Sequence, residues 1–71
     1  MTVTVGKCLL KDRLKDAKMT QAELASILNK KPQRISDYAN NARFMSPLTM
    51  KAIATVLKCH MDDLYEWIIT P

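Results

Sequence analysis

Hydrophobic residues recur at helical spacing along most of the chain. Leu10, Leu14 and Ala17 follow the i, i+4, i+7 spacing of one helix face, which predicts a helix over residues 7–18. Comparable patterns predict four further helices, over residues 21–28, 32–39, 47–57 and 61–67. Their inward-facing residues are expected to be Leu24, Ala25, Leu28, Ile35, Tyr38, Met50, Ile53, Ala54, Leu57, Met61, Leu64, Tyr65 and Ile68. Hydrophobic patterning therefore predicts an all-α fold of five short helices.

Local polar signals mark where these helices begin and end. Thr20 and Glu23 have the spacing of a capping box, in which each side chain accepts a hydrogen bond from the backbone N–H of the other residue. Asn29 tolerates the left-handed conformation in which many helices end. Further boundary signals are Pro32 at the start of the third helix, Asn40 and Asn41 after it, and Ser46 with Pro47 at the start of the fourth.

The N-terminal residues differ from the rest of the chain. Residues 2–5 alternate threonine and valine, so they are β-prone, but they are too few to form a sheet alone. Gly6 then interrupts the pattern. We expect residues 1–6 to be an arm, either loose or an edge strand that pairs with a second copy, and residues 7–69 to be one helical domain.

Composition and charge favour a small basic domain. The chain has 71 residues, 48% of them hydrophobic, and its single glycine disfavours a hairpin-rich β protein. Its net charge is +4 and its isoelectric point is about 9.3. Residues 30–51 carry five lysines and arginines against one acid, Asp37, whereas residues 58–71 carry three acids and one lysine. This polarity predicts a polyanionic partner, with nucleic acid the leading candidate, while an ordinary basic surface is the alternative.

Several other classes of protein are disfavoured. Cys8, Cys59 and His60 lack the spacing of a metal site, so we expect buried, reduced thiols and neither a metal nor another cofactor. With one histidine there is no plausible catalytic set, so an enzyme is not expected. Residues 1–10 do not resemble a signal peptide, and no segment approaches the roughly 20 apolar residues of a membrane span. The chain is predicted to be cytoplasmic, without a membrane partner.

The second and third predicted helices form a helix-turn-helix. Only residues 29–31 separate them, and such a tight turn lets the first helix brace the second. The second helix then projects its outer face into a major groove about 12 Å wide. We therefore expect residues 32–39 to be a recognition helix for double-stranded DNA.

The segment from Gln21 to Asn40 resembles the helix-turn-helix motif of the phage repressor and Cro family, also called the xenobiotic-response-element type. The resemblance is carried by residues 21–25 (Gln-Ala-Glu-Leu-Ala), Asn29, Ile35 and Tyr38, and it extends over residues 8–68. It implies a five-helix repressor-like domain. The chain departs from the family pattern where Asn29 replaces the turn glycine, Lys31 replaces the usual Ser or Thr cap, and Asn40-Asn41 replaces Asn-Gly. The loop near Phe44 is also longer than usual.

The resemblance assigns roles to individual residues. Base contacts are predicted for the outer face of residues 31–37, namely Lys31, Gln33, Arg34, Ser36 and Asp37. By their chemistry, Gln33 suits adenine, Arg34 suits guanine and Asp37 suits cytosine. Phosphate contacts are predicted for Gln21, Lys30, Asn41 and Arg43. Two alternatives stay open: Arg34 and Asp37 are spaced to pair with each other, and Gln33 is placed to cap its own helix.

The function expected from these features is a sequence-specific transcriptional regulator, either a repressor or a Cro-like protein. Such proteins usually bind as dimers, so we expect a homodimer formed through the N-terminal arm, through the apolar C-terminal residues Tyr65, Trp67 and Ile68, or through both. The alternative is a protein-interaction module, such as an antitoxin-like or antirepressor-like partner.

Overall fold

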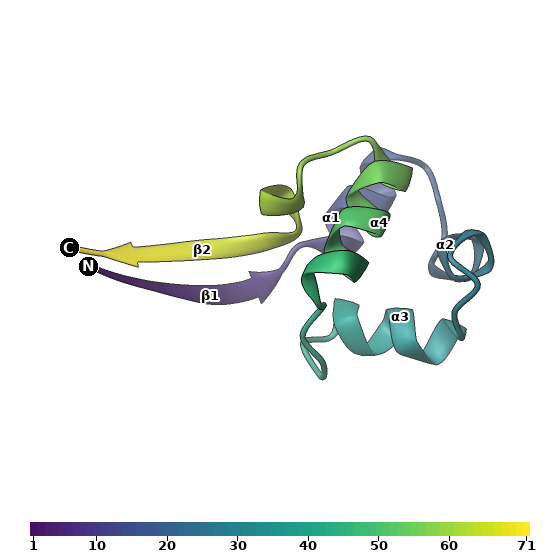
Figure 1. Cartoon of the computed structure of the whole chain (residues 1–71). Coiled ribbons are helices and arrows are strands. Elements are labelled where there is room, and N and C mark those ends of the chain that lie inside the picture. The colour runs from purple at the N-terminus through teal and green to yellow at the C-terminus, as the bar shows by residue number, and fades with distance from the viewer.

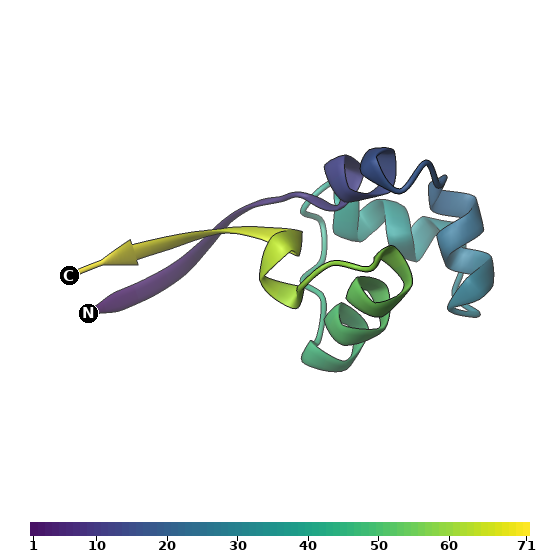
Figure 2. The same ribbon diagram turned by 90° about the horizontal axis from the view of Figure 1, so that it is seen from above.

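The computed structural model describes residues 1–71 as a helical body with a projecting two-stranded ribbon (Figures 1 and 2). The body contains the helices α1 (Leu10–Asp16), α2 (Gln21–Ile27), α3 (Pro32–Ala39) and α4 (Pro47–Leu57), followed by the single 3-10 turn η1 (Met61–Leu64). The strands β1 (Thr2–Cys8) and β2 (Tyr65–Thr70) form the ribbon. Both termini lie at its far end, and the molecule measures 40 × 22 × 19 Å. None of its helices has the length and apolar character that crossing a membrane requires.

The all-α prediction is wrong at the C-terminal end, because residues 61–67 do not form a fifth helix. One 3-10 turn is followed by the strand β2, whose sequence Tyr-Glu-Trp-Ile-Ile-Thr consists largely of aromatic and β-branched residues. Such residues fit a pleated surface better than a helix when a partner strand is available. The side chain of Trp67 also bends back, and its Nε1 donates to the carbonyl of Asp62 at 2.8 Å.

The N-terminal arm is a strand, but its partner is the C-terminal segment of the same chain. β1 and β2 are antiparallel, and the register pairs Thr2 with Thr70 and Val5 with Trp67. The regular register is interrupted after Val5 and resumes where Cys8 pairs with Tyr65. The strand therefore continues past Gly6, and the first helix begins at Leu10 rather than at residue 7.

The core confirms most of the predicted inward-facing residues. Leu10, Leu24, Ile35, Ile53 and Leu64 are completely buried, and Leu14, Ala25, Tyr38, Ala54, Leu57 and Tyr65 join them. Ala17 is exposed because α1 ends at Asp16, and Ile68 is half exposed because it lies on the ribbon. Cys8, which was expected to be a buried thiol, completes the core together with Ala39 and Met45, which were not predicted. Cys8 and Tyr65 are buried in the core, so they attach the base of the ribbon to the helical body.

Candidate nucleic-acid interface

The helix-turn-helix is formed by α2 and α3, as the sequence predicts. The capping box at the start of α2 is present: Glu23 N donates to Thr20 Oγ1 at 3.1 Å, and Thr20 N donates to Glu23 Oε1 at 3.2 Å. Asn29 takes a left-handed conformation with φ 56°, which turns the chain between the two helices. Leu24, Ala25 and Ile35 have no exposed surface, so the two helices are locked to the body through apolar packing.

Packing of its inner face leaves the opposite side of α3 free. Ile35, Tyr38 and Ala39 are buried, whereas Gln33 and Arg34 are exposed. Pro32 occupies the first turn, where its missing N–H costs no hydrogen bond. Lys31 precedes the helix and provides no side-chain cap, as its replacement of the usual Ser or Thr predicts. The exposed face of α3 is therefore polar and is held in place by the buried one.

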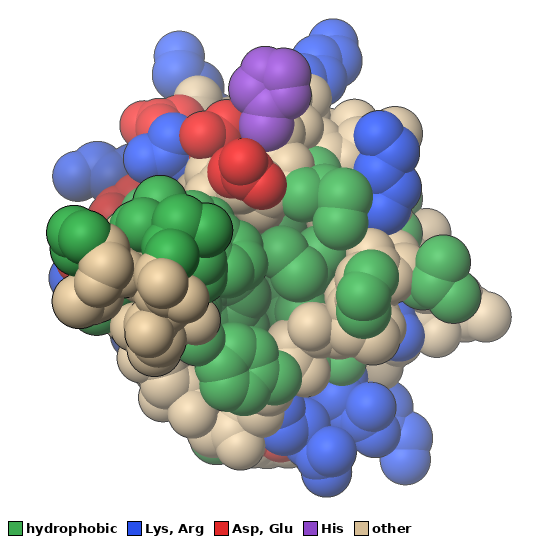
Figure 3. Space-filling model, turned by 60° about the vertical axis from the view of Figure 1, so that its left-hand side comes forward, with side chains coloured by type: hydrophobic (Ala, Val, Ile, Leu, Met, Phe, Trp, Pro, Cys, Tyr) green, Lys and Arg blue, Asp and Glu red, His purple; other side chains and the backbone are tan.

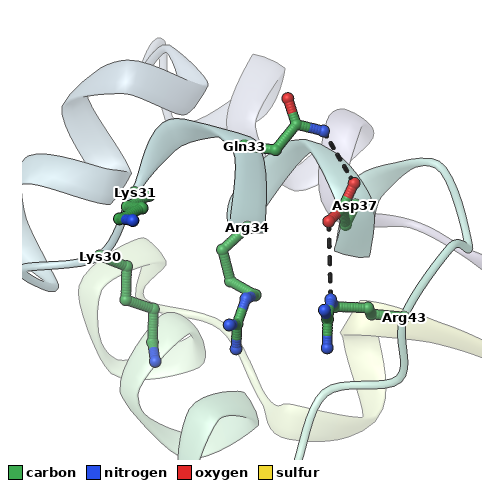
Figure 4. A pocket seen from close by; sticks show the side chains of 6 residues that line it. All are labelled: Lys30, Lys31, Gln33, Arg34, Asp37 and Arg43. Atoms are coloured by element: carbon green, nitrogen blue, oxygen red, sulfur yellow. Dashed lines mark hydrogen bonds and ion pairs between the residues drawn. The ribbon is translucent and has the colours of Figure 1, made fainter.

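Six side chains surround an open hollow of about 380 Å³ beside α3 (Figure 4). Four are cationic and one is a carboxylate, and none is hydrophobic; they are Lys30, Lys31, Gln33, Arg34, Asp37 and Arg43. All six were predicted as DNA contacts from the sequence. An open surface of this charge attracts a polyanion, and it contains no buried apolar wall of the kind that binds a small organic ligand.

Asp37 contacts both Gln33 and Arg43 in this hollow, and not Arg34, the partner that the i, i+3 spacing suggests. Gln33 Nε2 donates to Asp37 Oδ1 at 2.9 Å, and Arg43 Nε lies 3.5 Å from Asp37 Oδ2. Arg34 forms no ion pair with Asp37, and its guanidinium points into the hollow (Figure 4). The i, i+4 spacing of Gln33 and Asp37 is the sequence signal for the first of these bonds.

Arg43 reaches the hollow because the chain folds back after α3. Asn41 has a left-handed φ of 62°, and the backbone N–H groups of Ala42 and Arg43 donate to the carbonyl of Asp37 at 2.8 and 3.3 Å. This turn brings a residue from outside the helix alongside its outer face. The predicted grouping of Arg43 with α3 is therefore reproduced by the structure.

The other three predicted contact residues do not line the hollow. Gln21 is the first residue of α2 and is partly buried. Ser36 Oγ accepts a hydrogen bond from Asn40 Nδ2 at 3.2 Å, and Asn41 Oδ1 accepts one from Cys8 N at 2.9 Å. Asn41 therefore also ties the recognition segment to the base of the ribbon. Contacts of these three residues with DNA stay predictions.

The groups whose pKa values are shifted lie outside this surface. Burial raises the pKa of the Cys8 thiol and of the Tyr65 hydroxyl above their ordinary values. Burial also raises the pKa of the Cys59 thiol, with a further contribution from the charge of Asp63. These groups are thus held in their neutral forms, as expected for structural side chains.

Two helices joined by a tight turn, with cations gathered around the outward face of the second, define the helix-turn-helix class of DNA-binding proteins. The profile of the helix-turn-helix family matches residues 10–64, and the chain belongs to this family. The predicted kinship with the phage repressor and Cro type is thereby confirmed. Membership makes the chain a DNA-binding protein rather than an enzyme.

The chain is also similar to a prophage protein. It is 38% identical over 66 residues to the SPbeta prophage-derived uncharacterized HTH-type transcriptional regulator YopS of Bacillus subtilis (strain 168). The aligned part covers 92% of this chain and 89% of that protein. The family match covers α1 to η1, so both strands of the ribbon lie outside it.

Proposed function

We propose that the chain is a sequence-specific transcriptional regulator, a repressor or Cro-like protein, that inserts α3 into the major groove of double-stranded DNA. The observation that carries this proposal is the hollow beside α3, where side chains suited to base contacts and cations suited to phosphate contacts line one exposed surface. Neither Gln33 nor Arg34 is buried or masked by another part of the chain. The similar prophage protein, described as a transcriptional regulator, supports the same function.

The geometry divides the proposed contacts into two groups. Gln33 and Arg34, on the exposed face near the start of α3, are proposed to contact base edges, together with Lys31 just before the helix. Lys30 and Arg43 lie at the two ends of the hollow and are proposed to hold phosphates (Figure 4). Gln21 and Asn41 are proposed as additional phosphate contacts, and Ser36 as a minor base contact.

Titration against DNA fragments at two salt concentrations tests this function. Binding through phosphates releases counterions, so the affinity for every fragment should fall steeply as the salt concentration rises. One fragment should nevertheless stay the tightest ligand at both concentrations, because base contacts do not depend on salt in this way. Indifference to all DNA, together with tight binding of a protein partner, would instead support an interaction module.

A second part of the proposal is that two copies associate through the ribbon. The register places the side chains of Val3, Val5, Trp67 and Ile69 on one face. Trp67 and Ile69 are 43% and 66% exposed, and no charged residue lies among the four, although Asp62 borders them. Figure 3 shows hydrophobic side chains continuing from the ribbon onto the body, with Lys and Arg side chains around the edge of this view.

A second copy of this chain is the proposed occupant of this face. A ribbon of two strands is marginally stable by itself, so covering its apolar face would stabilise it. Because the four central side chains are uncharged, a self-complementary contact across a twofold axis brings no like charges together at its centre. Tyr65, predicted as a dimer contact, is only 4% exposed and therefore serves the monomer's own core.

The adjacent positions Ile68 and Ile69 provide a matched test of the dimer. They are both exposed, but they point to opposite faces of β2, so Ile68, which the sequence suggested as a dimer contact, lies outside the proposed contact. Ile69→Lys should convert a dimer to a monomer in sedimentation equilibrium, since it places a charge in the apolar contact, whereas Ile68→Lys should leave the dimer intact. A monomeric wild-type protein, or equal behaviour of the two variants, would contradict a dimer through this face.

A further inference from the structure

Asp37 is the one acid on a surface otherwise made of cations and a neutral amide. Between residues 30 and 51 it stands against five lysines and arginines. Its side chain is 26% exposed and lines the hollow beside Arg43 (Figure 4). A carboxylate facing a polyanionic ligand opposes binding, which makes its presence on a DNA-binding surface informative.

We propose that Asp37 is a positioning residue that sets the specificity of α3 by fixing Gln33 and by penalising phosphate contacts at its own position. This inference rests on the proposed function, since it concerns the same surface. It assigns to Asp37 a role different from direct pairing with cytosine, because both oxygens of the carboxylate already have partners within the protein.

The orientation of the Gln33 amide carries the first half of the inference. Its nitrogen donates to Asp37 Oδ1 at 2.9 Å, so the amide cannot turn over without placing its carbonyl oxygen against a carboxylate. In this orientation the Gln33 oxygen points away from Asp37, as Figure 4 shows. The group presented to DNA is therefore an acceptor, which favours a base that offers an exocyclic amino group, adenine or cytosine, over one that offers a carbonyl.

The contact with Arg43 carries the second half. Arg43 Nε lies 3.5 Å from Asp37 Oδ2, and the Arg43 side chain is 55% exposed. A DNA phosphate approaching Arg43 must compete with a carboxylate that is already beside it. The turn that delivers Arg43 is held to the backbone carbonyl of Asp37, so the two side chains stay adjacent. Asp37 thus weakens contacts that are independent of sequence, while its bond to Gln33 supports one that depends on sequence.

The variant Asp37→Asn tests both halves, because it keeps the shape of the side chain and removes its charge. The new amide would accept from or donate to Gln33 equally well, so the Gln33 amide would no longer be fixed. We expect affinity for a random-sequence duplex to rise about fivefold, from the loss of one nearby like charge. We also expect discrimination between an amino-bearing and a carbonyl-bearing base to fall toward equality at a single position of the selected site.

Two further variants separate this role from simpler ones. Asp12→Asn makes the same change in net charge on α1, where Asp12 is exposed and forms no ion pair, and it should leave both readouts unchanged. Gln33→Ala should abolish the same base preference without raising the affinity for random DNA. A thermal melt of Asp37→Asn should match that of the wild type within a few degrees, which excludes unfolding as the cause.

The outcomes of these measurements are distinct. Higher random-sequence affinity together with relaxed preference supports the role proposed for Asp37. If Asp37→Asn binds random DNA no more tightly, or retains the wild-type base preference, the proposal is overturned. If the wild-type protein binds no DNA at all, it is the proposed function that fails, and not the positioning role alone.

Discussion

Arg34 is the residue that best distinguishes a base contact from a phosphate contact. Its guanidinium points into the hollow without a partner, whereas Lys30 lies at the edge (Figure 4). Replacing Arg34 with alanine should weaken binding to the preferred site by about 1–3 kcal/mol, with little effect on random DNA. Lys30→Ala should weaken binding to all sequences about equally and reduce the salt dependence by about one phosphate contact.

Fluorescence anisotropy with a preferred and a random duplex measures both effects. The two variants remove the same formal charge, so a difference between them comes from what each side chain contacts. Identical losses on both duplexes for the two variants would show that α3 does not read bases through Arg34.

Lys58 occupies a backbone conformation that favours glycine. It ends α4 in the left-handed region, with φ 58° and ψ 43°, where a Cβ atom is crowded by the following carbonyl. Lys58→Gly should therefore stabilise the protein by about 0.5–1 kcal/mol in urea unfolding, after the greater flexibility of the unfolded chain is counted. Lys51→Gly, in the interior of the same helix, should destabilise it by about 1 kcal/mol; stabilisation by both changes would contradict the explanation.

At the scale of elements, the sequence predicted best those parts whose signals are local. The capping box at Thr20 and the left-handed turn at Asn29 each depend on residues within a few positions, and both appear as expected. The partners of Asp37 were less predictable. Arg43 meets it only because Asn41 reverses the chain, while the nearer candidate, Arg34, points elsewhere.

The ribbon shows why the rest could not be predicted. The segment 2–5 is too short to form a sheet by itself, and its partner residues lie more than sixty positions away. No local sequence signal therefore predicts the pairing. The spacing of Leu64, Tyr65 and Ile68 also suits a helix face, and only the available β1 strand decides for the extended form. Periodicity alone therefore misassigned the C-terminal segment.

The base of the ribbon should make stability sensitive to alkaline pH. Burial raises the pKa of the Cys8 thiol above its ordinary value of 9.0, so the folded state retains its proton more strongly than the unfolded state. The stability that this pKa difference contributes to the folded state is fully present below the ordinary pKa. It is lost as the pH rises through the higher pKa of the folded state. Urea unfolding midpoints should thus fall from about pH 8 to about pH 10.

The variant Cys8→Ala identifies the source of this loss. Without the thiol, the decline in the unfolding midpoint should become shallower, although Tyr65, whose pKa is also raised by burial, preserves part of it. An equally steep decline in Cys8→Ala would exclude the thiol as a contributor.

At the scale of the whole molecule, the two proposed functions occupy separate regions. The cationic surface lies along α3, and the apolar face lies on the ribbon, which projects from another side of the body (Figure 1). A dimer through the ribbon would therefore leave both α3 helices free. Two such helices related by a twofold axis can meet successive major grooves, about 34 Å apart.

Selection of bound duplexes from a random pool measures directly whether α3 reads base edges. The wild-type protein should enrich a site with two symmetric half-sites about one helical turn apart, and Arg34→Ala should lose the preference at one base pair in each half. A pool that stays random, or an unchanged site for Arg34→Ala, would contradict reading of DNA by α3.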